Sequence, residues 1–183
     1  LVGHWTLDDT DTTAVDSSGN NNDGTMTGGL DGANDSVPGQ VGTALDFDGS
    51  DDYISLPINL SPSSGTISHW LKPAENDRYM LAYYQSDTPI SGQHNGFSQP
   101  GDLLEIHTSL LNTGELSFNY QDGPDTAHFL LSSTEAVETN KWYHVAATWD
   151  TTGSAYLYVN GAQVDSFNAS SLSYSGNSPD TYF

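Results

Sequence analysis

Apolar and polar residues alternate along several short stretches of this chain, and the clearest stretch is residues 42–56. Leu45 and Phe47 alternate with polar residues before an acidic turn at 48–51, and residues 53–56 repeat the alternation after it. A two-residue period is typical of a strand with one buried face. The pattern predicts two antiparallel strands joined by a tight turn, with Leu45 and Phe47 in a core and the turn carboxylates in water.

The same period recurs along the rest of the chain. Strands are predicted for residues 2–7, 66–73, 78–84, 103–108, 115–120, 127–131, 141–150 and 154–164. Asn160-Gly161 is a strong hairpin signal, because both central positions of a type I′ turn need positive φ. No stretch keeps a helical period beyond about two turns. The chain is therefore predicted to be all-β, an antiparallel two-sheet β-sandwich made of one domain, residues 1–183.

Charge limits the partners that this chain can have. It carries 3 Lys+Arg against 24 Asp+Glu, a net charge of −21. Nucleic acid is excluded because neutralising phosphates needs a basic surface, and no apolar run is long enough for membrane insertion. Self-repulsion of this size is screened at ~1 M salt, where the Debye length is roughly 3 Å. The composition favours a halophile or its virus as the source; the alternative is a calcium-rich acidic surface in an ordinary secreted protein.

Three blocks of sequence carry a family resemblance. Residues 42–56, 66–73 and 141–164 resemble, in the same order, signature strands of laminin G-like, concanavalin A-like jelly-roll domains. The resemblance implies a jelly roll in an extracellular, cell-surface or virion-surface setting. Relatives close the sandwich with a strand that should begin at 180–183, where this sequence stops. We therefore expect the closing strand to be missing and the chain to be a piece of a longer surface or secreted protein.

The polar loop at 14–25 is the candidate metal site. It resembles a family loop that lies beside a structural calcium site in several relatives, and calcium takes six to eight hard oxygens. Asp16 is the expected anchoring carboxylate, with Asn20 and Asp23 as further ligands. The spacing lacks the terminal Glu of an EF-hand. The alternative is a solvated loop whose side chains cap their own backbone.

Aromatic residues are the candidate sugar-binding groups, because flat rings can stack on pyranose rings. We expect a ligand groove on the sheet that carries Tyr83, His107 and Tyr120, with the loop at 85–101 as its lip. The candidate ligand-binding residues are Tyr83, Tyr84, His94, Phe97, His107 and Tyr120. A wider aromatic set, of which half or more should be core, adds Trp70, Tyr79 and Trp149.

No arrangement of residues points to catalysis. Related glucanases use a Glu-x-Asp-x-x-Glu run of acids, which this sequence lacks; Glu105 and His107 are the nearest acid/base pair. The expected function is a non-catalytic extracellular module that binds surface glycans for adhesion or for host or substrate attachment, beside neighbouring domains. The alternatives are a structural bead of a surface appendage such as a virion spike, fibre, turret or adhesin, and an accessory domain of a polysaccharide-degrading enzyme.

Overall fold

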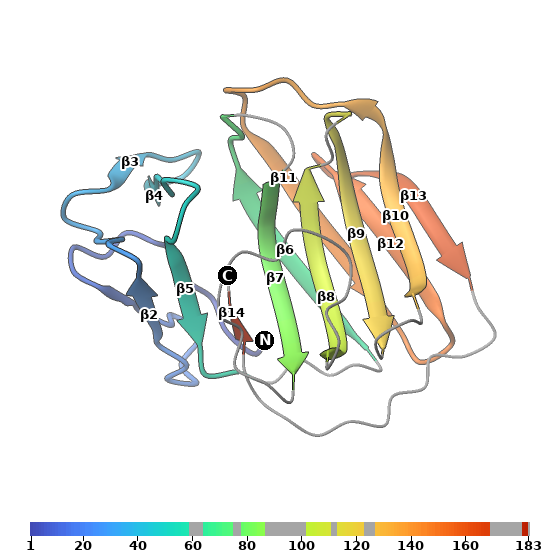
Figure 1. The fold of residues 1–183 in the computed structure, drawn as a ribbon, viewed down its shortest axis with the longest axis horizontal. Coiled ribbons are helices and arrows are strands. Elements are labelled where there is room, and N and C mark those ends of the chain that lie inside the picture. The colour runs from blue at the N-terminus through green and yellow to red at the C-terminus, as the bar shows by residue number, and fades with distance from the viewer. Residues whose placement is uncertain are drawn as a thin grey trace. The chain divides into compact units, whose positions relative to one another are not determined.

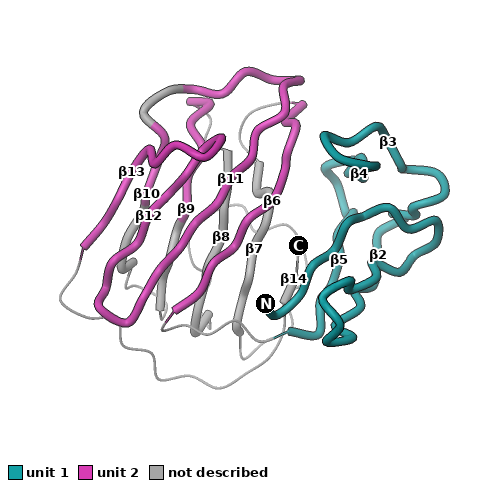
Figure 2. The backbone as a smooth tube through the Cα atoms, turned by 180° about the vertical axis from the view of Figure 1, so that it is seen from behind, with its two compact units in different colours: residues 1–59, 89–97, 179–183 teal, residues 60–88, 98–178 magenta. Residues whose placement is uncertain are grey.

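The structure is all-β in every part of the chain that it describes. A computed structural model describes residues 1–58, 64–74, 78–86, 102–110, 113–122, 127–168 and 181–182. Within these ranges every regular element is a strand, and none of them holds a helix that could cross a membrane. The chain divides into two compact units, residues 1–59, 89–97 and 179–183 and residues 60–88 and 98–178 (Figure 2). The predicted all-β class is confirmed, whereas the single domain stays a prediction.

The first unit contains short strands. They are β1 (Thr13–Ala14), β2 (Gly24–Thr27), β3 (Ser36–Pro38), β4 (Thr43–Leu45), β5 (Tyr53–Leu56) and β14 (Thr181–Tyr182). One sheet has the order β1-β2-β5-β14, and β3 pairs with β4 as a separate ribbon. The buried apolar side chains of this unit are Ala14, Met26, Leu30, Leu45, Ile54, Leu56 and Ile58.

The hairpin predicted at 42–56 has the right strands but the wrong partners. β4 pairs with β3, whereas β5 pairs with β2 and with β14. Two-residue alternation tells which face of a strand is buried and does not tell which strand lies beside it. Leu45 is buried as predicted, but Phe47 is 41% exposed. β14 begins where the closing strand was expected to be missing, and it pairs with β5.

In the acidic turn between β4 and β5, aspartate side chains accept hydrogen bonds from backbone N–H groups of the same turn. The N–H of Asp48 donates to Asp52 Oδ2 at 2.9 Å, and the N–H of Ser50 donates to Asp48 Oδ1 at 2.7 Å. Local bonds of this kind compete with a strand ladder. The turn therefore holds its shape without any pairing between β4 and β5.

The strand predicted at 2–7 is also wrong in extent, since only a single bridge joins Trp5 to Asp16. The carbonyl of Val2 accepts a hydrogen bond at 3.0 Å from the side-chain amide of Asn20. A polar loop side chain thus takes the place that a neighbouring strand would fill.

The second unit is a two-sheet antiparallel sandwich. Its strands are β6 (Gly65–Leu71), β7 (Arg78–Ser86), β8 (Asp102–Leu110), β9 (Glu115–Asp122), β10 (Ala127–Ala136), β11 (Tyr143–Trp149), β12 (Ser154–Val159) and β13 (Ala162–Asn168). The sheet orders are β7-β8-β9-β10 and β13-β12-β11-β6. In Figure 1 strands β7, β8 and β9 lie in front of β6 and β11.

The core of the second unit lies between its two sheets. Phe118 of β9 and Trp149 of β11 are almost completely buried, and their rings stack with centroids 5.8 Å apart. A Cβ at Gly65 would lie 2.4 Å from a ring carbon of Trp149, so β6 needs glycine at this close approach. The buried core residues are Ile67, Leu71, Leu116, Phe118, Leu131, Val145, Ala147, Trp149, Ala155 and Leu157.

The predicted Asn160-Gly161 hairpin is confirmed. Asn160 has φ 50° and Gly161 has φ 79°, and they join β12 to β13. The side-chain oxygen of Asn160 also accepts the N–H of His144 at 3.0 Å. The turn therefore sets the register of the hairpin and ties it to β11.

His69 is expected to make the stability of this unit depend on pH. Burial lowers the pKa of His69 to about 4, and the nearby His144 acts in the same direction. An unfolded histidine titrates near 6.5, so between pH 6.5 and about 4 the unfolded chain binds a proton that the folded chain does not. We expect the free energy of unfolding to fall by roughly 2–3 kcal/mol as the pH drops through this window. Urea unfolding at pH 7, 5.5 and 4.5 measures it.

The matched control is His69→Gln, which has no imidazole to protonate. The pH dependence of the wild type should exceed that of the variant by the stated amount, since all carboxylates are common to both chains. Equal slopes would show that His69 is not responsible.

Candidate functional site

Asp16 is the centre of the N-terminal loop, and its side chain is 7% exposed. Its Oδ1 accepts hydrogen bonds from the backbone N–H groups of His4 and Ser18, each at 2.9 Å. Its Oδ2 accepts from the hydroxyl of Ser18 at 2.8 Å and from the N–H of Asn22 at 3.0 Å. A carboxylate oxygen has two lone-pair sites. All four acceptor sites of Asp16 are therefore occupied by donors from the protein.

These hydrogen bonds keep Asp16 ionised in a buried place. Burial acts to raise the pKa of Asp16, but the bonds from His4, Ser18 and Asn22 outweigh it and hold the pKa well below its usual range. The carboxylate is thus an anion at neutral pH, surrounded by N–H and O–H groups from three points of the chain. It fastens the start of the chain to the polar loop.

The other predicted calcium ligands lie beside Asp16. Asp23 Oδ1 accepts the N–H of Asp16 at 2.8 Å, and Asn20 Nδ2 donates to Ser18 Oγ at 3.1 Å. The structure therefore brings Asp16, Asn20 and Asp23 together. Each of the three side chains also forms a hydrogen bond within the loop at 14–25, which agrees with the alternative of a solvated loop whose side chains cap their own backbone.

This arrangement does not fit Asp16 as a calcium ligand. Calcium binds oxygen lone pairs, and those of Asp16 already accept hydrogen bonds, so an ion at Asp16 would have to displace at least one donor. A calcium site in the loop at 14–25 stays a prediction.

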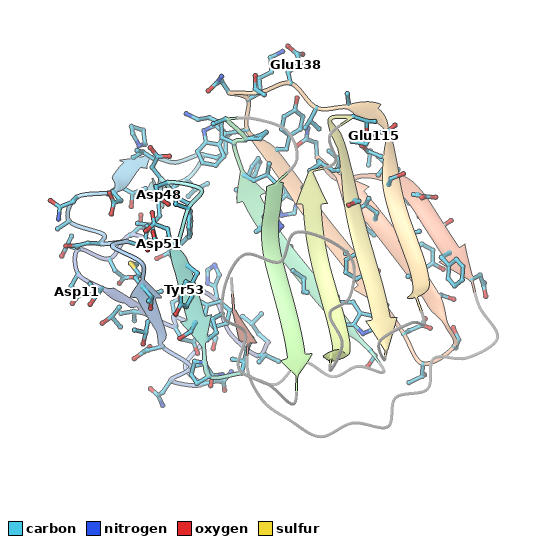
Figure 3. All side chains as sticks on the ribbon, viewed as in Figure 1. Asp11, Asp48, Asp51, Tyr53, Glu115 and Glu138 are labelled. Carbon is cyan, nitrogen blue, oxygen red and sulfur yellow. The ribbon has the colours of Figure 1, made fainter. Side chains whose placement is uncertain are left out.

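A second acidic group lies in the turn between β4 and β5. Carboxylate oxygens of Asp48, Asp51 and Asp52 lie within 4.8 Å of one another. Figure 3 labels Asp48 and Asp51 near the start of β5. The carboxylates of the turn at 48–51 were predicted to be in water, and Asp48 and Asp51 are exposed. Exposed acidic groups of this kind are common without a bound ion.

The predicted ligand positions fall partly on neighbouring strands of one sheet. Tyr83 on β7 pairs with Ile106 on β8, which pairs with Tyr120 on β9. His107 lies one position along β8 from that row and pairs with Asn119. Because successive strand residues alternate between the two faces, the register puts Tyr83 and Tyr120 on one face of this sheet and His107 on the other.

Of the remaining three ligand candidates, the structure places one. Tyr84 lies on β7 and pairs with Glu105. His94 and Phe97 lie outside the described residues. Ligand binding by this set of six residues stays a prediction.

An exposed aromatic residue lies on the other sheet. Trp70 of β6 is 46% exposed, and its ring meets that of His144 edge-on with centroids 5.1 Å apart. The sequence contained the signal for this position, because Ile67, His69 and Leu71 alternate with it. Trp70 must then lie on the outward face of β6.

The two-sheet antiparallel sandwich defines a class of jelly-roll proteins, and a family model places the chain within it. The model of the concanavalin A-like lectin/glucanases superfamily matches residues 48–183, and the chain belongs to this family. Comparison with curated proteins gives no match.

Solved structures share the fold at low sequence identity. Domain 4 of AbnA, an extracellular arabinanase from Geobacillus stearothermophilus solved with arabinotriose, is 22% identical with a TM-score of 0.62, covering 99% of this chain and 77% of that one. The binding domain of Paraclostridial Mosquitocidal Protein 1 is 19% identical with a TM-score of 0.65, covering 100% of this chain and 42% of that one. An S-layer domain-containing protein from Clostridium thermocellum is 22% identical with a TM-score of 0.54, covering 94% and 74%. These likenesses show the fold alone.

Proposed function

We propose that the chain is a non-catalytic recognition module that binds glycans outside the cell or on a cell or virion surface. The observation that carries the proposal is Trp70, a large ring left 46% exposed on a rigid sheet. Exposed aromatic rings on rigid strands are suited to stacking on sugars. The arabinotriose complex of domain 4 of AbnA supports the same function by analogy of fold.

The proposal places the module in a surface setting and in high salt. The similar structures include a domain of an extracellular enzyme and an S-layer domain-containing protein. A net charge of −21 suits a salt-rich medium, because salt screens self-repulsion. A halophile or its virus is therefore our proposed source.

The pattern of acidic residues in the sequence favours a binding module over a glycoside hydrolase. Glycoside hydrolysis uses two carboxylates that flank the scissile bond. The sequence lacks the Glu-x-Asp-x-x-Glu run of related glucanases. The acidic group at Asp48, Asp51 and Asp52 lies in a turn that uses Asp48 and Asp52 to bond its own backbone.

A binding screen tests the proposal. The chain is incubated in molar salt with polysaccharides and with halophile cell envelopes, and both bound protein and released reducing sugar are measured. We expect saturable binding without sugar release. Release would make the chain an enzyme. A folded chain that binds nothing would favour the structural bead of a surface appendage.

A further inference from the structure

The outward face of the sheet β13-β12-β11-β6 carries two pairs of aromatic rings. The first pair is Trp70 on β6 and His144 on β11, whose ring planes are inclined at 61°. The second pair is Tyr156 and Tyr158 on β12, whose centroids are 6.5 Å apart. None of these four side chains is buried. We call these four residues the aromatic platform.

The residues beside the platform are small or hydroxylated. In the strand register, Ser68 pairs with Ala146, and Ala146 pairs with Tyr158. Ser68 and Ala146 therefore lie in the row next to Trp70 and His144, on the same outward face. In the following row, Thr148 lies between Thr66 and Tyr156. Small side chains leave the faces and edges of the neighbouring rings accessible.

The inward face of the same strands shows why these rings point outward. Val145, Ala147 and Trp149 alternate with the outward residues of β11 and are buried in the core. On β12, Ala155 and Leu157 likewise alternate with the outward tyrosines and are buried in the core. The platform is therefore carried by strands whose other face is packed, so the backbone that positions its rings is held in place before any ligand arrives.

The three strands that carry the platform are uncharged in a strongly acidic chain; Lys72, which follows β6, lies over the ring of Trp142, with its Nζ 5.7 Å from the ring centroid. Strands β6, β11 and β12 contain no Asp, Glu, Lys or Arg, although the chain has 24 Asp+Glu. On β13 the carboxylate of Asp165 accepts the N–H of Ser132 on β10 at 3.0 Å, so it is engaged with the opposite sheet. A site for a cation would carry acids, and a site for an anion would carry Lys or Arg.

We propose that the aromatic platform binds a neutral glycan chain, with the Trp70–His144 pair and the Tyr156–Tyr158 pair as two stacking positions. This inference rests on the proposed function, and it assigns that function to this face and to uncharged sugars. Aromatic rings pack on the C–H faces of sugars, and nearby hydroxyls exchange hydrogen bonds with the sugar hydroxyls. The net charge of −21 opposes glycans that carry uronate or other acidic groups.

The test compares variants of the platform with a variant of an exposed ring outside it. Trp70→Ala and the double variant Tyr156→Ala/Tyr158→Ala are expected to weaken binding of neutral oligosaccharides by about tenfold each. The matched control is Phe47→Ala, which removes an exposed ring outside the platform and should bind like the wild type. Trp70→Phe keeps a ring and should therefore retain most of the wild-type affinity for these oligosaccharides. Titration calorimetry in molar salt gives each affinity, and thermal unfolding shows that each variant is folded.

Each outcome decides a separate question. If the wild type binds glycans and neither Trp70→Ala nor Tyr156→Ala/Tyr158→Ala loses affinity, the assignment to the platform is overturned and the proposed function stands. If the wild type prefers polyuronates, the neutral class is wrong. If Trp70→Ala abolishes binding to a protein domain and leaves glycan affinity unchanged, the platform is a protein contact. A folded wild type that binds no glycan in the panel overturns the proposed function and this inference with it.

Discussion

Replacing Asp16 by asparagine is expected to lower the thermal midpoint of unfolding far more than replacing an exposed aspartate of the same unit. An amide has one acceptor oxygen, and its NH₂ group would face the hydroxyl of Ser18, which can turn to accept from it, and the N–H of Asn22, which can only donate. The part-buried N–H of Asn22 would lose its acceptor, and an unsatisfied donor shielded from water is costly. The control is Asp46→Asn, because Asp46 is exposed.

The wild type and Asp16→Asn together test for a calcium site. If Asp16 binds only hydrogen-bond donors of the protein, a chelator should leave the thermal midpoint of the wild type unchanged in molar salt. If Asp16 anchors a calcium ion, the chelator should lower the midpoint of the wild type and leave that of Asp16→Asn unchanged. Thermal scans of both chains with and without chelator distinguish the two results. A chelator effect confined to the wild type would establish the calcium site.

Phe118→Ala is expected to destabilise the second unit by about 3–5 kcal/mol, the range for removing a large aromatic side chain from a core. Phe118 is fully buried, and its ring stacks on Trp149 across the two sheets. Its loss removes the transfer free energy of the ring and leaves a cavity that the strands can fill only in part. Since domains are stable by about 5–15 kcal/mol, the variant should be close to unfolding.

Urea unfolding followed by tryptophan fluorescence measures this change. Phe118→Leu is the control, because it keeps an apolar side chain and should cost less than half as much. A cost for Phe118→Ala of less than about 1 kcal/mol would show that the contact between the sheets is loose.

Local signals predicted the strands better than their partners. Asn160-Gly161 predicted a hairpin correctly because the turn itself requires positive φ at both residues, which the structure shows. The alternation at 42–56 predicted strands that exist as β4 and β5, but their partners are β3 and β2. Pairing between distant strands depends on the packing of the whole chain, which a two-residue period does not encode.

The candidate sites show the same limit. The polar composition of residues 14–25 singled out Asp16, Asn20 and Asp23, and these residues do lie together. Composition alone does not distinguish a metal from backbone donors, because both bind carboxylate oxygens. The N–H of His4 reaches Asp16 from outside the loop, so only the folded chain shows that the carboxylate is already satisfied.

The pairing of β6 with β11 has a consequence for how the protein folds. Leu71 pairs with Tyr143, so the nearest ends of the two strands are 143 − 71 = 72 residues apart in sequence. β11, β12 and β13 follow one another with short connections and form a meander, whereas β6 lies at the end of their sheet. Contacts this distant form slowly, because a long loop must close before they are gained. During synthesis β6 therefore leaves the ribosome well before its partner exists, and the sheet can be completed only after β11 has been made.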